Sequence, residues 1–242
     1  MYVADKLTIV ARTVAEIPEK VLPSIRPEFA ARLGSSMSEI FPDFASNFPA
    51  TAKNMEKHWA KPAVAFTDIG RNWLAQMFLE QPLLNLFIKQ ASPPAYVEGP
   101  IFEEARQILP EQWLALYRFM ESFTITSESF YSPLGWQNTP LPRGLSADEF
   151  STETHTKKSK LKAFEKQLDV NKPQHLRCWM LSDAHDSLWI NEQHCDKKVY
   201  HVHADAFADA YVLPNPGETL DRYLAHVVAG GLPKDFDFRS AD

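Results

Sequence analysis

Histidine and cysteine side chains gather between residues 175 and 203, the part of the chain richest in groups that could bind a metal. They are His175, Cys178, His185, His194, Cys195, His201 and His203. His201 and His203 lie two residues apart on a predicted strand, so both imidazoles point to one face of it. Such a pair can hold a metal, with Asp205, His194 or Cys195 as the third ligand. One hypothesis is therefore a metal-dependent hydrolase that uses His201 and His203.

The spacing of these residues favours a simpler interpretation. The sequence contains neither Cys-x-x-Cys nor His-Glu-x-x-His, the compact patterns typical of zinc sites. We therefore expect half-exposed histidines on a sheet, two reduced cysteines, no metal and no cofactor.

Other catalytic patterns are also missing from the sequence. There is no Gly-x-Ser-x-Gly, neither cysteine has the context of a protease nucleophile, and no glycine-rich phosphate loop occurs. Asp183 and Asp186 with Glu192 could act as paired carboxylates, but acids between two strands are typical of solvated turns. The sequence therefore predicts a protein that is not an enzyme.

Acidic residues are concentrated near the C-terminus. The formal net charge is −6, and from Met180 onward eleven acidic residues face five basic ones, so this quarter holds the whole imbalance. Such a surface repels nucleic acid and attracts cationic partners. Four acids on expected loops are the predicted partner-binding residues: Asp183, Asp186, Glu192 and Asp196. The alternative is that the negative charge only serves solubility.

Trp136 is the aromatic residue most suited to an interface. It follows Ser132-Pro133-Leu134-Gly135, a turn-rich segment, and an exposed loop tryptophan is a frequent binding anchor. A core position is the alternative for Trp136. Trp113, Trp179 and Trp189 fall on predicted inward faces and are expected in the core.

Residues 1–95 are predicted to form a helical, proline-rich N-terminal region. Pro27 to Leu33 is a short helix candidate closed by Gly34, and residues 73–79 and 83–89 show helical apolar spacing on either side of Pro82. Residues 90–96 are the expected linker. We find no signal peptide and no run of roughly 20 apolar residues, so we expect a cytoplasmic protein with no membrane partner.

Residues 96–242 are predicted to form an α+β domain. Pro110 should begin a helix with a stripe of apolar residues, and Ser146 with Glu149 has capping-box spacing ahead of a lysine-rich helix. Four strands are expected next, at 176–181, 188–190, 198–203 and 207–213, followed by a helix that starts at Asn215-Pro216. The fold class is thus an antiparallel sheet of about four or more strands packed by helices.

Residues 105–231 resemble the SMI1/KNR4 (SUKH) superfamily. The resemblance is carried by Leu109-Pro110 with Trp113 and Leu116, then Asp186 with Leu188-Trp189-Ile190, then Lys198-Val199-Tyr200-His201 with Asp205, and finally Leu220-x-x-Tyr223-Leu224. The chain departs from the family pattern at Ser122-Phe123-Thr124, where Asn-Gly is usual, and the predicted helix 146–168 is long for an insertion.

The resemblance implies a binding protein, most often an immunity protein that neutralises a toxin delivered by neighbouring bacteria. The expected partner is a cognate protein toxin with a basic surface, such as a nuclease, and the expected chemistry is coverage of its site. Two alternatives remain open: the hydrolase described above, and an intracellular adaptor or regulator of the same fold.

Overall fold

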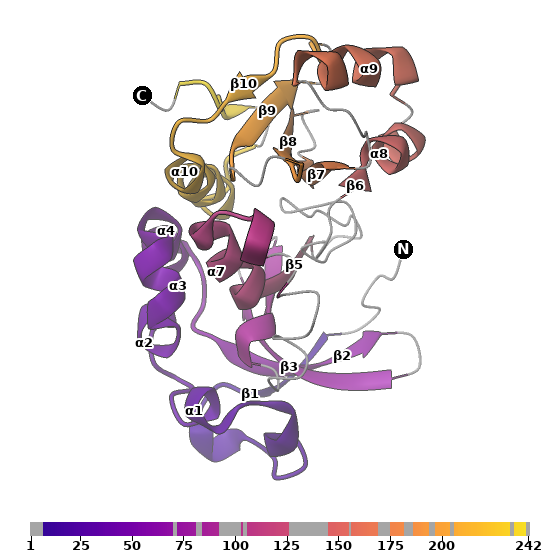
Figure 1. Ribbon diagram of the computed structural model, residues 1–242. Helices are drawn as coiled ribbons and strands as arrows, with labels where there is room; N and C mark the ends of the chain where they lie inside the picture. Colours follow the sequence, from indigo (N-terminus) through magenta and orange to yellow (C-terminus); the bar gives the residue numbers. More distant parts are fainter. Residues whose placement is uncertain are drawn as a thin grey trace.

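A computed structural model describes residues 7–69, 72–80, 84–91, 103, 106–125, 145–154, 156–168, 175–181, 186–193, 197–203, 206–232 and 235–240. Two antiparallel sheets lie at opposite ends of the molecule, and helices pack between and around them (Figure 1). The predicted α+β class is confirmed, and the N-terminal part does contain helices.

The first sheet has five strands in the order of the chain. They are β1 (Leu7–Ala11), β2 (Ala63–Ile69), β3 (Asn72–Glu80), β4 (Leu84–Ile88) and β5 (Met120–Ile125). Strands β4 and β5 pair across residue 95, where the sequence predicts a domain boundary. That boundary stays a prediction, and this sheet draws strands from both sides of it.

The helices predicted at residues 73–79 and 83–89 are wrong, because both segments are strands. Met77 and Leu79 face the main core, while Phe78 packs on Ala63 and Ala65 on the opposite face of the sheet. A strand buried on both faces is a continuous apolar run, and its periodicity does not differ from that of a buried helix.

Short helices cover this sheet, and all of them except α2 begin at a proline. They are α1 (Pro27–Ala30), α2 (Met37–Ile40), α3 (Pro42–Asn47) and α4 (Pro49–His58), with single 3₁₀ turns at Val14–Glu16, Leu22–Ser24 and Lys89–Ala91. Proline suits the first helical position because no N–H is needed there. Gly34 follows α1 with a φ of 100°, which agrees with its predicted role as a helix stop.

Helix α7 (Glu111–Phe119) joins this layer to the rest of the molecule. Its predicted core residues Trp113, Leu116 and Tyr117 are buried. Phe119 at its end stacks on Phe44 of α3, with ring centroids 3.7 Å apart. Helix α7 is therefore fixed against α3 by aromatic packing as well as by its own apolar stripe.

The second sheet has the order β10-β9-β8-β7-β6. Its strands are β6 (Leu145–Ser146), β7 (Leu176–Leu181), β8 (Asp186–Asn191), β9 (Val199–His203) and β10 (Tyr211–Val212). The strands predicted at 176–181, 188–190 and 198–203 are confirmed. The strand predicted at 207–213 contains only the two residues of β10.

Helices cover both faces of the second sheet. Helices α8 (Ala147–Thr154) and α9 (Lys158–Gln167) pack through Phe150 and Phe164 on Trp189. Helix α10 (Pro216–Val228) packs on the other face, where Val199 joins its buried stripe of Leu220, Tyr223, Leu224, Val227 and Val228. The alternation predicted for residues 199–203 and the predicted start of α10 are both confirmed.

A single main core runs through much of the chain. Its buried members extend from Ala11 to Phe238 and include residues of α4, α7 and α10 as well as strands from both sheets. Trp113 and Trp179 belong to it and Trp189 lies in the core under α8 and α9, so the core positions predicted for all three are confirmed. Within the described ranges, no helix has the length and apolar character that a membrane crossing would need.

Candidate functional site

Asp186 does not lie on a loop. It is the first residue of β8, it is only 9% exposed, and its Oδ1 lies 2.7 Å from His201 Nε2. The predicted loop position of Asp186 is therefore wrong, because the strand begins at this residue and its carboxylate bonds to His201 inside the protein; its assignment to a partner interface stays a prediction. A buried carboxylate of this kind needs a hydrogen-bonding partner such as His201.

The two described residues of the predicted acidic surface, Asp186 and Glu192, lie far apart in the structure. Glu192 follows β8, and its half-buried side chain lies 3.6 Å from Arg177 Nε. Asp186 and Glu192 stand at opposite ends of β8, roughly 20 Å apart by the rise of a strand. Asp183, Asp196 and Trp136 lie outside the described residues, so their assignment to a partner interface stays a prediction.

His201 is a core residue. Its side chain is buried, and its ring stacks on Phe238 with centroids 4.9 Å apart and an angle of 21°. The prediction of half-exposed histidines is thus wrong for His201 and confirmed for His203. Within the part of the chain that the structure describes, no three His, Cys, Asp or Glu side chains are placed to hold a metal. Asp205, His194 and Cys195, the ligands considered from the sequence, lie outside it.

Cys178 is buried in β7 and its Sγ lies 3.3 Å from the Met180 carbonyl oxygen. Burial raises the pKa of this thiol far above its ordinary value. Because the thiolate is the nucleophilic form, Cys178 is an inert core residue.

A pocket of about 450 Å³ opens between α3 and α7. Arg26, Arg106, Arg118 and Lys197 bring four positive charges to its lining, and Asp43 and Glu111 bring two negative charges. The amides of Asn47 and Gln90 and the apolar side chains of Phe44, Leu114 and Ala115 complete the described lining. The described lining thus holds more cations than acids, but two of these cations have acidic partners outside it: Arg26 lies 4.0 Å from Glu28 and Arg106 lies 3.6 Å from Glu103.

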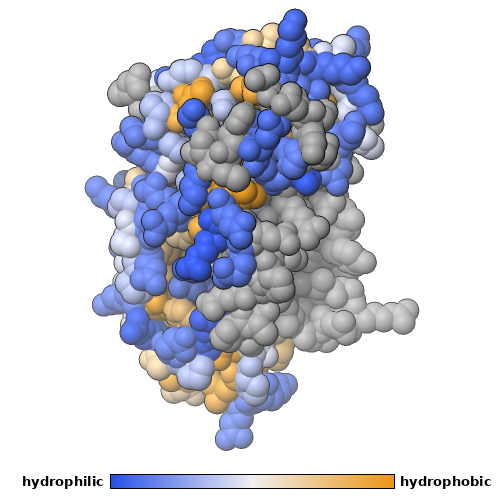
Figure 2. Space-filling model, in the orientation of Figure 1, coloured by the Kyte–Doolittle hydropathy of each residue, from blue (hydrophilic) through white to orange (hydrophobic). Residues whose placement is uncertain are grey.

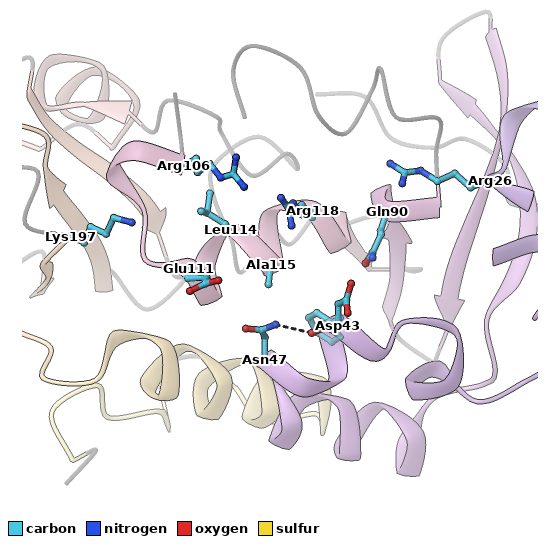
Figure 3. Close-up of a pocket in the computed structure, with 11 residues that line it drawn as sticks. Arg26, Asp43, Asn47, Gln90, Arg106, Glu111, Leu114, Ala115, Arg118 and Lys197 are labelled. Atoms are coloured by element: carbon cyan, nitrogen blue, oxygen red, sulfur yellow. Dashed lines mark hydrogen bonds between the residues drawn. The ribbon is translucent and has the colours of Figure 1, made fainter. Parts of the chain in front are cut away.

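The two helices set the shape of this pocket. Glu111, Leu114, Ala115 and Arg118 follow one another at the i, i+3, i+4, i+7 spacing of a single helical face. From α3, Asp43 and Asn47 face them, and Asn47 Nδ2 donates to the Asp43 carbonyl oxygen at 2.8 Å. In Figure 3 Arg26 and Lys197 extend toward the middle from opposite sides. Figure 2 shows strongly hydrophilic side chains over the middle of the molecule, where α7 lies in Figure 1.

Sequence reasoning did not find this pocket. Its four cations are spread from residue 26 to residue 197, and none belongs to a local motif. One signal was present, since Glu111 and Arg118 share the polar face of a helix that was predicted. The residues that face it come from the N-cap of α1, from α3, from the 3₁₀ turn at Lys89–Ala91 and from the segment before β9, which only the fold brings together.

Comparison of the chain with family models, with curated proteins and with solved structures finds no match. The site is therefore interpreted from its own residues.

Proposed function

We propose that this chain is an immunity protein, which binds a cognate bacterial toxin in the cytoplasm and neutralises it. The observation that carries the proposal is the order of elements over residues 105–231. A helix with Trp113, the strands with Trp189 and Tyr200, and a closing helix with Tyr223 follow one another as in the SMI1/KNR4 pattern. These four side chains are all buried, as expected for the scaffold of such a fold.

The placement of the reactive side chains favours binding over catalysis. His201 and Asp186 bond to each other in the core, and Cys178 is a buried thiol. Groups that would serve a hydrolase at a surface thus stabilise packing here. A protein that acts by covering its partner needs no reactive group of its own.

The proposed interface includes Asp183, Asp196 and Trp136, with Glu192 at the edge of the second sheet. A basic toxin surface would complement these acids, which chiefly speeds association. An intracellular adaptor of the same fold would use the same surface, so only the partner distinguishes the two functions.

The test asks whether this chain protects cells from the toxin and whether the two proteins bind each other. The toxin-like product of the adjacent gene should arrest growth when expressed alone, and co-expression of this chain should restore growth. Purified together, the two proteins should form a complex. An adjacent product that neither binds this chain nor is neutralised by it would overturn the proposal.

Charge reversal then locates the interface. The double variant Asp183→Lys/Asp196→Lys should associate more slowly and with a weaker dependence on salt. A matched control is Glu19→Lys/Asp235→Lys, which reverses two exposed acids elsewhere. Equal association rates for the two variants would show that Asp183 and Asp196 do not belong to the interface.

A further inference from the structure

We propose that strand β1 is the surface through which two copies of this chain form a dimer. The second copy places its own β1 antiparallel to this one, so that the two first sheets join into one continuous sheet. This surface lies outside the residues proposed for toxin binding, and the dimer does not depend on that function.

Strand β1 lies at one edge of the first sheet, with β2 as its neighbour on the inner side. Within the described ranges, no hydrogen bond joins the backbone of Leu7–Ala11 to an element other than β2. An edge strand presents a row of N–H and C=O groups to which another strand can bind. The chemistry of this edge therefore fits an extended segment of protein backbone.

The other three edges of the two sheets carry features that disfavour such pairing. Strands β6 and β10 have only two residues each, and β5 contains Glu121. Short edge strands and charged side chains are common protections against association between sheets. Strand β1 has five residues, Leu-Thr-Ile-Val-Ala, with neither a charge nor a proline. Among the four edges, β1 is therefore the one best suited to pair with another strand.

Exposed apolar side chains gather near this edge. Ile9 of β1 is 39% exposed, Val14 in the 3₁₀ turn that follows β1 is 47% exposed, and Leu22 in the next turn is 45% exposed. Lys20 Nζ lies 5.5 Å from the ring centroid of Phe66, so the segment before Leu22 lies over β2, the neighbour of β1. Figure 2 shows hydrophobic side chains at the lower end of the molecule, where α1 lies in Figure 1.

The charge of the strand identifies its partner as a second copy. A toxin with a basic surface would find no acidic residue on Leu7–Ala11 to pair with, whereas an uncharged strand matches another uncharged strand. A two-fold axis at β1 sets the same residues against each other, as in the usual symmetric dimer. The outward N–H and C=O groups of each copy then bind those of the other, and both Ile9 side chains lie on the same face of the joined sheet.

The size of the contact predicts a weak dimer. Five residues of strand are about 17 Å long by the rise of a strand. A contact made by one strand and a few apolar side chains belongs to the small class of interfaces, which bury less than about 1,200 Å² in total. We therefore expect a dimer that dissociates on dilution.

The experiment is sedimentation velocity of the full chain at concentrations from about 5 to 500 μM, a range that covers weak association. We expect the sedimentation coefficient to rise with concentration from that of a monomer to that of a dimer. Ile9→Lys should weaken the dimer about tenfold or more, because a charge on an edge strand disfavours pairing and the axis brings the two lysines near each other.

Val212→Lys is the matched control. Val212 is a 43% exposed residue of β10, an edge strand of the other sheet, so its replacement should leave the dimer unchanged. Thermal melts show whether each variant stays folded. If Ile9→Lys melts at a lower temperature, Thr8→Lys decides, since Thr8 is an exposed residue of the same strand and should weaken the dimer equally.

Three results would overturn the proposal: a monomer at every concentration, a dimer that the folded β1 variants leave unchanged, and equal weakening by Val212→Lys. The last two would place the contact on another surface or attribute it to charge in general. Growth protection against the toxin is measured separately, so each of these results leaves the proposed function untouched.

Discussion

Asp221 is the residue that fastens α10 to α4. Its Oδ1 accepts hydrogen bonds from the Thr51 N–H at 2.8 Å and the Thr51 hydroxyl at 2.7 Å, and its Oδ2 accepts one from the Ala50 N–H at 2.9 Å. These N–H groups lie in the first turn of α4, where no intrahelical acceptor exists, and Phe48 at the N-cap has no side-chain oxygen. A residue far away in sequence therefore caps this helix, and its charge suits the helix dipole.

Replacement of Asp221 by alanine should destabilise the protein by about 2–3 kcal/mol, because the N–H groups of Ala50 and Thr51 lose their acceptor, while the Thr51 hydroxyl can still donate to the Asp221 carbonyl oxygen. Urea unfolding measures this free energy. Asp235→Ala, at an exposed acid near the C-terminus, is the control and should change it by less than about 0.5 kcal/mol. A loss for Asp221→Ala no larger than that of the control would show that the cap contributes little.

At the scale of the element, the capping box before α8 links helix stability to pH. Ser146 donates to Glu149 Oε2 from its hydroxyl at 2.6 Å and from its N–H at 2.7 Å, while Glu149 N–H donates to Ser146 Oγ at 3.3 Å. These hydrogen bonds hold the pKa of Glu149 below its ordinary value of 4.5, and the bond from the Ser146 hydroxyl has the largest effect. Because the folded pKa is lowered, the contribution is present above pH 4.5 and is lost as the pH falls through the lowered value.

Glu149→Gln should therefore lower stability at neutral pH, and the difference from the unmodified chain should shrink below about pH 4. Melting curves at several pH values test this. Glu165 is the matched control, because burial, followed by the nearby Asp148, raises the pKa of its carboxyl. Glu165→Gln should show the opposite trend: the stability of this variant relative to the unmodified chain should increase as the pH rises. A pH-independent effect of Glu149→Gln would contradict the capping role.

Helix α10 provides the second prediction at this scale. Leu224 is fully buried between the second sheet and the N-terminal helices. Leu224→Ala should cost about 2–5 kcal/mol, the range for large core truncations, as measured by chemical unfolding. Leu232→Ala, at a leucine that is 53% exposed, should have little effect. Similar midpoints for the two variants would place α10 outside the cooperative core.

At the scale of the whole molecule, the main core crosses the boundary predicted at residue 95. Trp59 Nε1 donates to the Val228 carbonyl oxygen at 2.7 Å, and Asn54 Nδ2 donates to the Ala225 carbonyl oxygen at 3.0 Å. Together with Asp221, these contacts join α4 to α10 over about 170 residues of sequence. We therefore expect one unfolding transition, with tryptophan fluorescence and far-ultraviolet circular dichroism changing at the same denaturant concentration. Two separated transitions would instead indicate two domains that unfold independently, with a boundary near residue 95.

The sequence by itself determined the features that depend on neighbours along the chain. The capping box at Ser146, the proline start of α10, its buried stripe and the alternation of β9 all follow from local steric and hydrogen-bonding rules. Tertiary structure decided the rest. Strand β3 is buried on both faces by residues distant in sequence, Asp186 pairs with His201, and the pocket between α3 and α7 needs residues from 26 to 197 to converge. Contacts between distant segments leave no local periodicity, so no pattern in the sequence could specify them.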